Sequence, residues 1–332
     1  MIRSRIYGTG RALPDQILTN LELEKRVDTT DQWIVERTGI RERRILEHGL
    51  AASDLAAEAA RKACEAAGWE PSTLDCIIVG TVTADSPLPS TAVHVQRKIG
   101  ARPGCAAFDL TAACAGFVYG LSVADAFIKS RQFKRVCVVG VEVLSRIVNW
   151  TDRNTCVLFG DGAGAVVVGE GDAIQGRSDR GILSTHIFAD PSGIEDLHIP
   201  AGGSRMPASP ETVASGLHYV HMNGKKVFAG AVRNISAACE EALKANEITP
   251  AQLDHVVAHQ ANLRIIEGVA QRCELPLSKF HLNLERYGNT SSASVPIALD
   301  EAVRAGKIRE GETLLLCALG AGFAYGSALV RW

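Results

Sequence analysis

Two segments of the chain follow the same pattern, and this internal repeat limits the possible folds more than any other feature. Residues 63–79 and 242–258 each lead from a helical stretch through a proline to an apolar run. The prolines are Pro71 and Pro250, and a Leu-Asp pair follows each of them at the same distance. Each copy is typical of a helix, a short proline turn and a buried strand. The chain is therefore predicted to consist of two similar halves.

A second, shorter repeat supports this division into two halves. Residues 164–168 and 326–330 both read as a glycine followed by small and aliphatic residues. We place the boundary near residues 169–176, which gives an N-terminal half of residues 1–172 and a C-terminal half of residues 173–332. The segment 190–216 is rich in Pro, Ser and Gly and is interpreted as a long surface excursion.

Strands and helices alternate between these anchors. The strands are continuously apolar, which indicates that both faces of each sheet are covered. We expect helices outside, two mixed sheets, and Ala- and Gly-rich helices at 114–120 and 291–298 between the sheets, because small side chains let a buried helix sit there. The strands are expected to include residues 106–110, 136–141 and 314–318, and the helices residues 52–67, 114–129, 227–245 and 263–273.

Charge and cysteine content exclude several classes of protein. A formal net charge of −2 lacks the basic excess that nucleic-acid binding needs. The nine cysteines form no C-x-x-C pair and are odd in number, which favours reduced thiols in a reducing compartment. No apolar run reaches the roughly 18 residues of a membrane span, and the N-terminus lacks the apolar core of a signal peptide. We expect a cytoplasmic protein that binds neither nucleic acid nor membrane.

Cys114 lies where a predicted strand gives way to a predicted helix. The strand ends near Leu110 and the helix begins near Ala113, so the thiol falls in the first helical turn. Unpaired N–H groups and the macrodipole favour a thiolate there, and the same N–H groups are placed to bind an oxyanion. The alternative is a packed thiol in an Ala-rich helix. The small neighbours, which leave room for a substrate, favour the nucleophile.

His259 follows a buried strand and precedes a helix. A helix N-terminus disfavours the imidazolium, so we expect a neutral ring that donates one N–H. Taken alone, this position is more typical of a structural histidine with one satisfied hydrogen bond.

Asn289 occupies a repeat position roughly equivalent to that of Cys114 and offers a neutral amide donor. The common alternative is a turn or N-cap asparagine beside Gly288.

Together, Cys114, His259 and Asn289 are the groups that a decarboxylative condensation needs. A thiol accepts an acyl group by thioester exchange, and two neutral donors stabilise the enolate that forms when a malonyl thioester loses carbon dioxide. No metal is required, and His218 and His221 lack the acidic or thiol partners of a metal site.

Three segments resemble the active-site motifs of the β-ketoacyl-acyl carrier protein synthase III family. They are residues 111–117, 259–266 and 288–296, and the resemblance extends over essentially the whole chain, including residues 33–41, 159–165 and 326–332. It implies a thiolase-like duplicated fold, layered α-β-α-β-α with two mixed five-stranded sheets. It also implies an acyltransferase that starts fatty acid synthesis by a decarboxylative Claisen condensation of an acyl-CoA with malonyl-acyl carrier protein, through an acyl-Cys114 intermediate. Asn289 is typical of the initiating enzymes, because elongating relatives carry a second histidine there.

The resemblance also implies a coenzyme A site and a homodimer. Trp33 and Arg153 match residues that sandwich the adenine, with Arg37 nearby, and a flat indole opposite a guanidinium is a sensible clamp for a purine. Two further residues, Gly224 and Asn262, match positions along the pantetheine arm. Coenzyme A thioesters are substrates, and no cofactor is expected.

Leu88 matches a position where some members carry a phenylalanine that reaches across the dimer to close the acyl pocket. The smaller leucine leads us to expect that primers longer or more branched than acetyl are accepted.

Two features depart from the family pattern. Of the basic residues that bind acyl carrier protein, Arg264 and Arg272 remain, while Ala229 and Gln271 stand in place of lysines; Lys225 and Lys226 are predicted to replace the lost charge. The malonyl donor is thus expected on carrier protein, with coenzyme A as the alternative.

The oxyanion loop reads Gly320-Ala321-Gly322 where some members have three glycines. The oxyanion donors expected are the backbone N–H groups of Cys114 and Ala321, which the Ala321 methyl does not remove.

Alternative functions remain at this point. One is an acyltransferase or a secondary-metabolite condensing enzyme with the same fold, which the three intact residues do not exclude. Another is a non-catalytic coenzyme A-binding homologue, which would be favoured only if one of the three were replaced. A metal-dependent hydrolase is opposed by the absence of clustered ligands.

Overall fold

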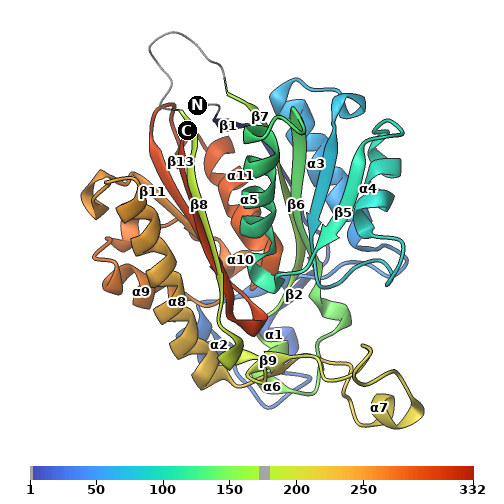
Figure 1. Ribbon diagram of the computed structural model, residues 1–332. Helices are drawn as coiled ribbons and strands as arrows, with labels where there is room; N and C mark the ends of the chain where they lie inside the picture. Colours follow the sequence, from blue (N-terminus) through green and yellow to red (C-terminus); the bar gives the residue numbers. More distant parts are fainter. Residues whose placement is uncertain (1–2, 172–179) are drawn as a thin grey trace.

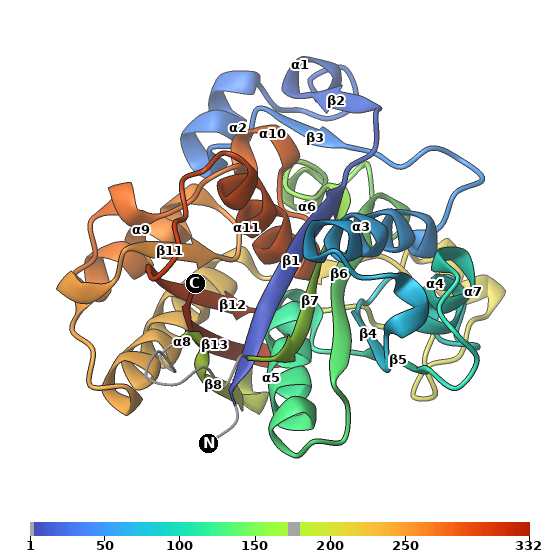
Figure 2. The same cartoon turned by 90° about the horizontal axis from the view of Figure 1, so that it is seen from above.

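The computed structural model describes residues 3–171 and 180–332, which form two main sheets with helices outside and between them, and two small two-stranded sheets (Figure 1). The first sheet has five strands in the order β1-β7-β6-β4-β5, and the second has four in the order β11-β12-β13-β8. Helices α3 and α4 cover the first sheet, α8 and α9 cover the second, and α5 and α11 lie between them (Figure 2). The predicted α-β-α-β-α layering and mixed sheets are confirmed. The boundary predicted at 172/173 lies outside the described residues.

The elements of the first half agree closely with the sequence-based predictions. The helix predicted at 52–67 and the strand predicted at 106–110 have the observed limits. In chain order the elements are β1 (Ser4–Ala12), β2 (Ile17–Thr19), α1 (Asn20–Leu23), α2 (Asp31–Thr38), β3 (Glu42–Arg44), α3 (Ala52–Ala67), β4 (Cys76–Gly80), α4 (Thr91–Ile99), β5 (Ala106–Leu110), α5 (Gly116–Lys129), β6 (Arg135–Val143), α6 (Arg153–Cys156) and β7 (Asp161–Glu170).

The second half follows the same plan after a long excursion. The surface segment predicted at 190–216 contains a short strand and a short helix, and α7 projects from the molecule at the lower right of Figure 1. The elements are β8 (Gly181–Ala189), β9 (Leu197–His198), α7 (Pro210–Ala214), β10 (His221–Met222), α8 (Gly224–Ala245), β11 (His255–Ala258), α9 (Leu263–Arg272), α10 (Leu284–Tyr287), α11 (Ser294–Arg304), β12 (Thr313–Leu319) and β13 (Ala324–Arg331).

Among the described residues the second sheet has four strands, so the prediction of five was wrong for this half. The place of β5 is taken by an isolated parallel bridge between Val256 and Phe280. After Phe280 the backbone hydrogen-bonds with a side chain instead of with a neighbouring strand. The Gln260 amide donates to His281 O (3.1 Å) and accepts from Asn283 N–H (3.1 Å). The backbone groups that would extend a strand are satisfied by this amide, and the ladder stops after one bridge. The strands β8, β13, β12 and β11 otherwise follow the same order as β1, β7, β6 and β4. In both sheets the first two of these pairs are antiparallel and the third is parallel.

Each inner helix is entered through a tight 3-10 turn. The turns span Ala113–Ala115 and Ser291–Ala293, and their first residues have φ angles of 45° and 50°. The predicted helix at 114–129 therefore begins at Gly116, and Cys114 lies in the turn before it. Small residues are needed because the layers approach closely: a Cβ on Gly140 of β6 would meet Ser292 O at 2.2 Å. Close packing between the sheets thus brings the two turns together at one end of the inner helices.

Candidate active site

A mostly apolar cavity of about 130 Å³ lies where the two turns meet. Cys114 of the N-terminal half and His259 and Asn289 of the C-terminal half all line it. The three residues predicted to act together therefore share one cavity. The walls are mainly apolar and include Leu158, Phe159, Leu197, Met222, Val227 and Leu319. Such a lining suits an acyl chain and the arm of a thioester.

The Cys114 thiol is buried, with 8 % of the residue exposed. Burial raises the pKa of this thiol to about 12, the Ser291 side chain opposes the rise by hydrogen bonding, and the negative charge of Glu142 adds to it. The expectation of a favoured thiolate at a helix N-terminus is therefore not met. Desolvation of the charged sulfur outweighs the local N–H groups, so the thiol form is favoured at neutral pH.

His259 is held through one ring nitrogen. Its Nδ1 lies 2.6 Å from Ser294 Oγ, which also accepts the Gln260 N–H at 3.3 Å. The Ser294 hydroxyl retains a proton that it can donate to Nδ1, and in that arrangement the ring proton lies on Nε2. Burial lowers the pKa of His259 to about 3. The ring is thus neutral, as the sequence predicted, although burial rather than the helix N-terminus is the cause.

Asn289 is fixed by its backbone and by its side-chain oxygen. Its N–H donates to Leu158 O (2.8 Å) and its carbonyl accepts from Gly160 N–H (3.0 Å), which ties it to the N-terminal half. The side-chain Oδ1 accepts from Ser291 N–H at 2.8 Å. Since the oxygen is occupied, the Nδ2 amide remains as the donor of this side chain. Gly288 precedes it with φ 64° and ψ −158°, a conformation that favours glycine.

The Gly320-Ala321-Gly322 loop lies against the backbone of Cys114. A Cβ on Gly320 would meet Cys114 N at 2.5 Å, so this residue must be glycine for the loop to approach. Cys114 and Ala321 both stand in the first turn of a 3-10 segment, where backbone N–H groups have no acceptor within the helix. Their N–H groups are therefore suited to the oxyanion role predicted for them.

The residues predicted for coenzyme A fall into two connected groups. Gly224 and Asn262 line the cavity. Outside it, the guanidinium carbons of Arg37 and Arg153 each lie 4.9 Å from the centroid of the Trp33 ring. Asn262 joins the groups, because its Nδ2 donates to Arg37 O at 3.1 Å while its Oδ1 caps α9 through Arg264 N–H at 2.9 Å.

Leu88 does not reach this cavity within one chain. It is 81 % exposed, on the loop between β4 and α4. A role for Leu88 in the acyl pocket therefore depends on a partner subunit.

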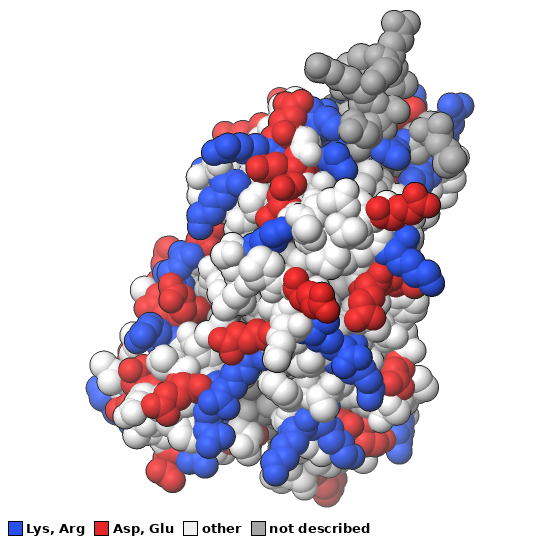
Figure 3. Space-filling view, turned by 90° about the vertical axis from the view of Figure 1, so that its left-hand side faces the viewer, with Lys and Arg blue, Asp and Glu red and all other residues white. Residues whose placement is uncertain are grey.

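The four predicted carrier-protein residues stand on neighbouring helices. Lys225 and Lys226 lie in the first turn of α8, and Arg264 in the first turn of α9. Arg272 ends α9, about 12 Å along its axis from Arg264. Lys226 also pairs with Asp196 at 3.3 Å. Figure 3 shows the face on the side of α8 and α9 with basic and acidic side chains interspersed rather than a single basic patch.

Three polar residues beside the cavity were missed in the sequence. Ser294 sets the proton position on His259, Ser291 contacts Cys114 and Asn289, and Glu142 accepts a hydrogen bond from Ser291 at 3.2 Å. The one available signal was Glu142 itself, a carboxylate that interrupts the apolar strand β6.

In residues 3–171 and 180–332 no group of three or more His, Cys, Asp or Glu side chains could hold a metal ion. Within the same described residues, no helix has both the length and the apolar character that crossing a membrane requires.

Comparison with known proteins gives matches over the full length of the chain. A family model described as 3-Oxoacyl-[acyl-carrier-protein (ACP)] synthase III matches residues 108–191, and the model of the C terminal part of the same family matches residues 243–332. A beta-ketoacyl-[acyl-carrier-protein] synthase III of Caldanaerobacter subterraneus subsp. tengcongensis is 50% identical over 331 residues, which cover 100% of this chain and 98% of the relative. The protein of the same description from Paramagnetospirillum magneticum is 51% identical over 331 residues, 100% of this chain and 99% of the relative. The crystal structure of 3-oxoacyl-[acyl-carrier-protein] synthase III from Aquifex aeolicus VF5 is similar with a TM-score of 0.89 and 43% identity, covering 99% of this chain and 100% of that one.

Proposed function

The chain belongs to the 3-oxoacyl-acyl carrier protein synthase III family, and we propose that it starts fatty acid synthesis by condensing an acyl-CoA primer with malonyl-acyl carrier protein. The observation that carries this proposal is the convergence of Cys114, His259 and Asn289 on one cavity. A thiol, two neutral donors and an apolar wall are what decarboxylative condensation needs. The related acyltransferase and the non-catalytic coenzyme A-binding protein are not favoured, because relatives at about half identity over the full length share one description.

In the first half-reaction, the Cys114 sulfur attacks the thioester carbonyl of the primer. The carbonyl oxygen gains negative charge, which the N–H groups of Cys114 and Ala321 stabilise. Coenzyme A leaves and the acyl group remains on sulfur. The apolar lining of the cavity excludes water, which protects the acyl-enzyme from hydrolysis.

In the second half-reaction, the malonyl thioester binds with its carbonyl oxygen between His259 and Asn289. Loss of carbon dioxide turns this carbonyl into an enolate, which the His259 Nε2–H and the Asn289 Nδ2–H stabilise by hydrogen bonding. A neutral imidazole suits this role, because it donates without first having to be protonated. The enolate carbon then attacks the acyl group and releases the Cys114 sulfur. Since the protein's own groups and the two thioesters supply every reacting group, no cofactor is proposed.

The substrate-binding residues extend this proposal along the surface. Trp33 and Arg153 hold the adenine of coenzyme A, with Arg37 beside them, and Gly224 and Asn262 contact the pantetheine arm. The guanidinium of Arg153 must then withdraw from the Trp33 ring when a purine enters. Carrier protein binds through Arg264, Arg272, Lys225 and Lys226, in the cytoplasm.

The direct test is mass spectrometry of the intact protein after incubation with a panel of acyl-CoA thioesters. We expect one acyl adduct on Cys114, and a β-ketoacyl product when malonyl-acyl carrier protein is added. Malonyl-CoA in its place distinguishes the two possible donors. Cys114→Ala should give no adduct, whereas Cys105→Ala, at a buried thiol away from the cavity, should be acylated normally. An adduct on another cysteine, or none at all, would contradict the proposal.

Primer choice depends on a homodimer in which Leu88 of the partner subunit closes the acyl pocket. Since leucine fills less space than phenylalanine, we expect isobutyryl-CoA and octanoyl-CoA to acylate Cys114 at rates within about tenfold of acetyl-CoA, a range that one or two methylene contacts span. Leu88→Phe should restrict the pocket and favour acetyl-CoA. A strict preference for acetyl-CoA in the unaltered protein would contradict this prediction.

A further inference from the structure

Glu142 is a fully buried carboxylate at the end of the sheet, next to the two turns of the active site. Both of its oxygens lie near the Val82 N–H (3.2 Å each). One oxygen also accepts from Thr83 Oγ1 at 2.6 Å and from Thr81 Oγ1 at 3.3 Å, and the other accepts from Ser291 Oγ at 3.2 Å. Within residues 3–171 and 180–332, all of these donors are neutral. A buried carboxylate that is held by neutral donors alone retains a strong affinity for a proton.

Ser291 links this carboxylate to the nucleophile. Its hydroxyl donates to Glu142, and the turn that carries it packs against the turn that carries Cys114, where the Ser291 side chain lowers the pKa of the thiol by hydrogen bonding. Its backbone N–H is held by Asn289 Oδ1, and its φ of 50° keeps it in a tight turn. The hydroxyl is therefore fixed between a thiol that must lose a proton and a carboxylate that can accept one.

The neighbouring histidine is poorly suited to take that proton. Burial disfavours the protonated ring and lowers the pKa of His259 to about 3, and when the Ser294 hydroxyl donates to Nδ1 the ring hydrogen is on Nε2. A neutral ring with this proton position is a donor in the cavity, not a base. Acylation of Cys114 thus needs another acceptor.

We propose that Glu142 accepts the Cys114 proton through the Ser291 hydroxyl when the acyl group is transferred. This inference rests on the function proposed above. As the sulfur–carbon bond forms, the thiol proton passes to Ser291 Oγ and the hydroxyl proton passes to Glu142. The thioester bond of the primer breaks, and coenzyme A leaves as a thiolate that is protonated in solvent. The negative charge moves from Glu142 to the departing sulfur, so the cavity gains no charge.

The proton stored on Glu142 is used in the second half-reaction. When the enolate carbon attacks the acyl group, the electron pair of the breaking bond returns to the Cys114 sulfur. Glu142 then returns its proton through Ser291, which restores the thiol and the carboxylate. Over the cycle Glu142 neither gains nor loses a proton.

The surroundings of Glu142 suit such an exchange at physiological pH. Burial raises its pKa to about 7, against the hydrogen bonds from Thr83, Val82, Ser291 and Thr81. Among the described titratable groups, the Cys114 thiol interacts electrostatically with this carboxylate, and the neutral His259 ring lines the same cavity as Cys114. A base with a pKa near the working pH is effective in proton transfer.

The test is the pH dependence of Cys114 acylation in a single turnover, measured by rapid quenching and mass spectrometry. In the unaltered protein the rate should rise with pH through a midpoint near 7, because Glu142 must be ionised to accept the proton. Glu142→Gln keeps an acceptor for Val82 N–H and should slow acylation about 100-fold, with no midpoint near 7. Glu142→Asp should retain the midpoint at a reduced rate. Ser291→Ala should also lose the midpoint near pH 7. Because both residues act in one relay, the double variant should acylate no more slowly than either single variant.

Several outcomes separate this inference from the proposed function. If Glu142→Gln and Ser291→Ala both keep the midpoint near 7, or acylate within about threefold of the unaltered rate, the relay is refuted while the condensation stands. If the unaltered protein forms no acyl-Cys114, the proposed function itself fails. Ser291→Ala leaves the carboxylate and its other contacts in place, so it tests the relay even if Glu142→Gln does not fold.

Discussion

At the scale of single residues, the polar groups around the cavity are oriented in pairs. Ser294 occupies one nitrogen of His259, and Ser291 N–H occupies the oxygen of Asn289. In each pair the remaining ring or amide N–H is left as a donor. The donors are thus arranged before substrate binds, which is how a protein stabilises a developing charge without reorganising during reaction.

This pairing predicts a different effect for each half-reaction when Asn289 is changed. Asn289→Asp keeps the acceptor for Ser291 N–H but replaces the amide donor with a carboxylate oxygen. Condensation should fall by about 100-fold or more, while acylation of Cys114 changes far less. Asn289→Ala should also separate the two steps. Measuring the acyl adduct and the β-ketoacyl product in the same samples checks this, and loss of both steps together would be the contrary result.

Glu142 also predicts how stability depends on pH. Its pKa is raised in the folded protein from 4.5 to about 7. The protonated form is therefore favoured by folding: this contribution is complete below pH 4.5 and is lost as pH rises through about 7. Relative to Glu142→Gln, the free energy of unfolding of the unaltered protein should decline by about 3 kcal/mol across that interval and stay level above it. Urea denaturation of both proteins from pH 4.5 to pH 8 measures the difference, which should be constant if the pKa is not raised.

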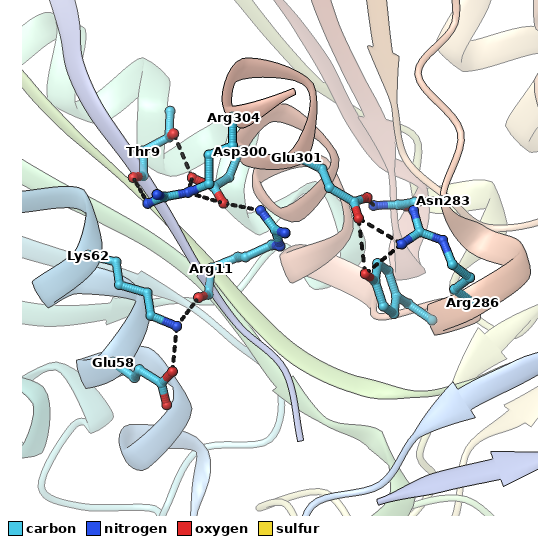
Figure 4. A network of polar contacts seen from close by, with 10 residues as sticks. Thr9, Arg11, Glu58, Lys62, Asn283, Arg286, Asp300, Glu301 and Arg304 are labelled. Atoms are coloured by element: carbon cyan, nitrogen blue, oxygen red, sulfur yellow. Dashed lines mark hydrogen bonds and ion pairs between the residues drawn. The ribbon is translucent and has the colours of Figure 1, made fainter. Parts of the chain in front are cut away.

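At the scale of helices and strands, a buried carboxylate joins the inner helix α11 to the edge strand β1. Figure 4 shows Asp300 accepting from Thr9 Oγ1 (2.7 Å) and from the guanidinium groups of Arg11 (2.5 Å) and Arg304 (2.9 and 3.0 Å). Asp300 is fully buried, whereas both arginine side chains are partly exposed. One carboxylate thus anchors α11, the helix that begins with Ser294, to the other half of the molecule.

Removing this charge should weaken the link between the halves. Asp300→Asn leaves two guanidinium groups without their anion, and the free energy of unfolding should fall by about 3 kcal/mol, within the range for breaking a buried ion pair. The control is Glu58→Gln, which removes the exposed pair with Lys62 that is also drawn in Figure 4 and should change stability by less than about 0.5 kcal/mol. Equal effects of the two substitutions in chemical denaturation would argue against the anchor.

At the scale of the whole molecule, the two halves share the core that lies between their sheets. Buried residues of α5 and α11 pack in one cluster with strands of both sheets, for example Val138 of the first and Leu316 of the second. Ser292 Oγ donates to Gly80 O at 2.6 Å across the same boundary. Each half alone would expose this face to water.

A protein made of residues 180–332 alone should therefore not fold cooperatively, although it contains a sheet of its own. Separating the halves exposes the apolar faces that α11, β12 and β13 turn toward α5 and the first sheet. Urea denaturation followed by circular dichroism should show no sharp transition, and addition of residues 1–171 should restore one. A sharp transition in the isolated half would show that the repeat forms two independent domains.

The sequence by itself determined the repeat, the layered arrangement and the type of the helices and strands that it predicted. These follow from local periodicity and small-residue content, and the helix at 52–67 and the strand at 106–110 were predicted to the residue. Candidate residues were visible as well, because Cys114 and His259 each follow a buried strand.

Only the tertiary structure decided what surrounds these residues. Cys114, Ser291 and Glu142 are far apart in the chain, and their contact depends on the close approach of two turns and a strand. The pKa of Cys114 and the proton position on His259 depend on burial and on single partners such as Ser294, which no local pattern indicates. The missing fifth strand of the second sheet has the same origin, since the Gln260 side chain satisfies the backbone there. Local sequence specifies which elements form, whereas desolvation and hydrogen bonding across the core decide how their side chains react.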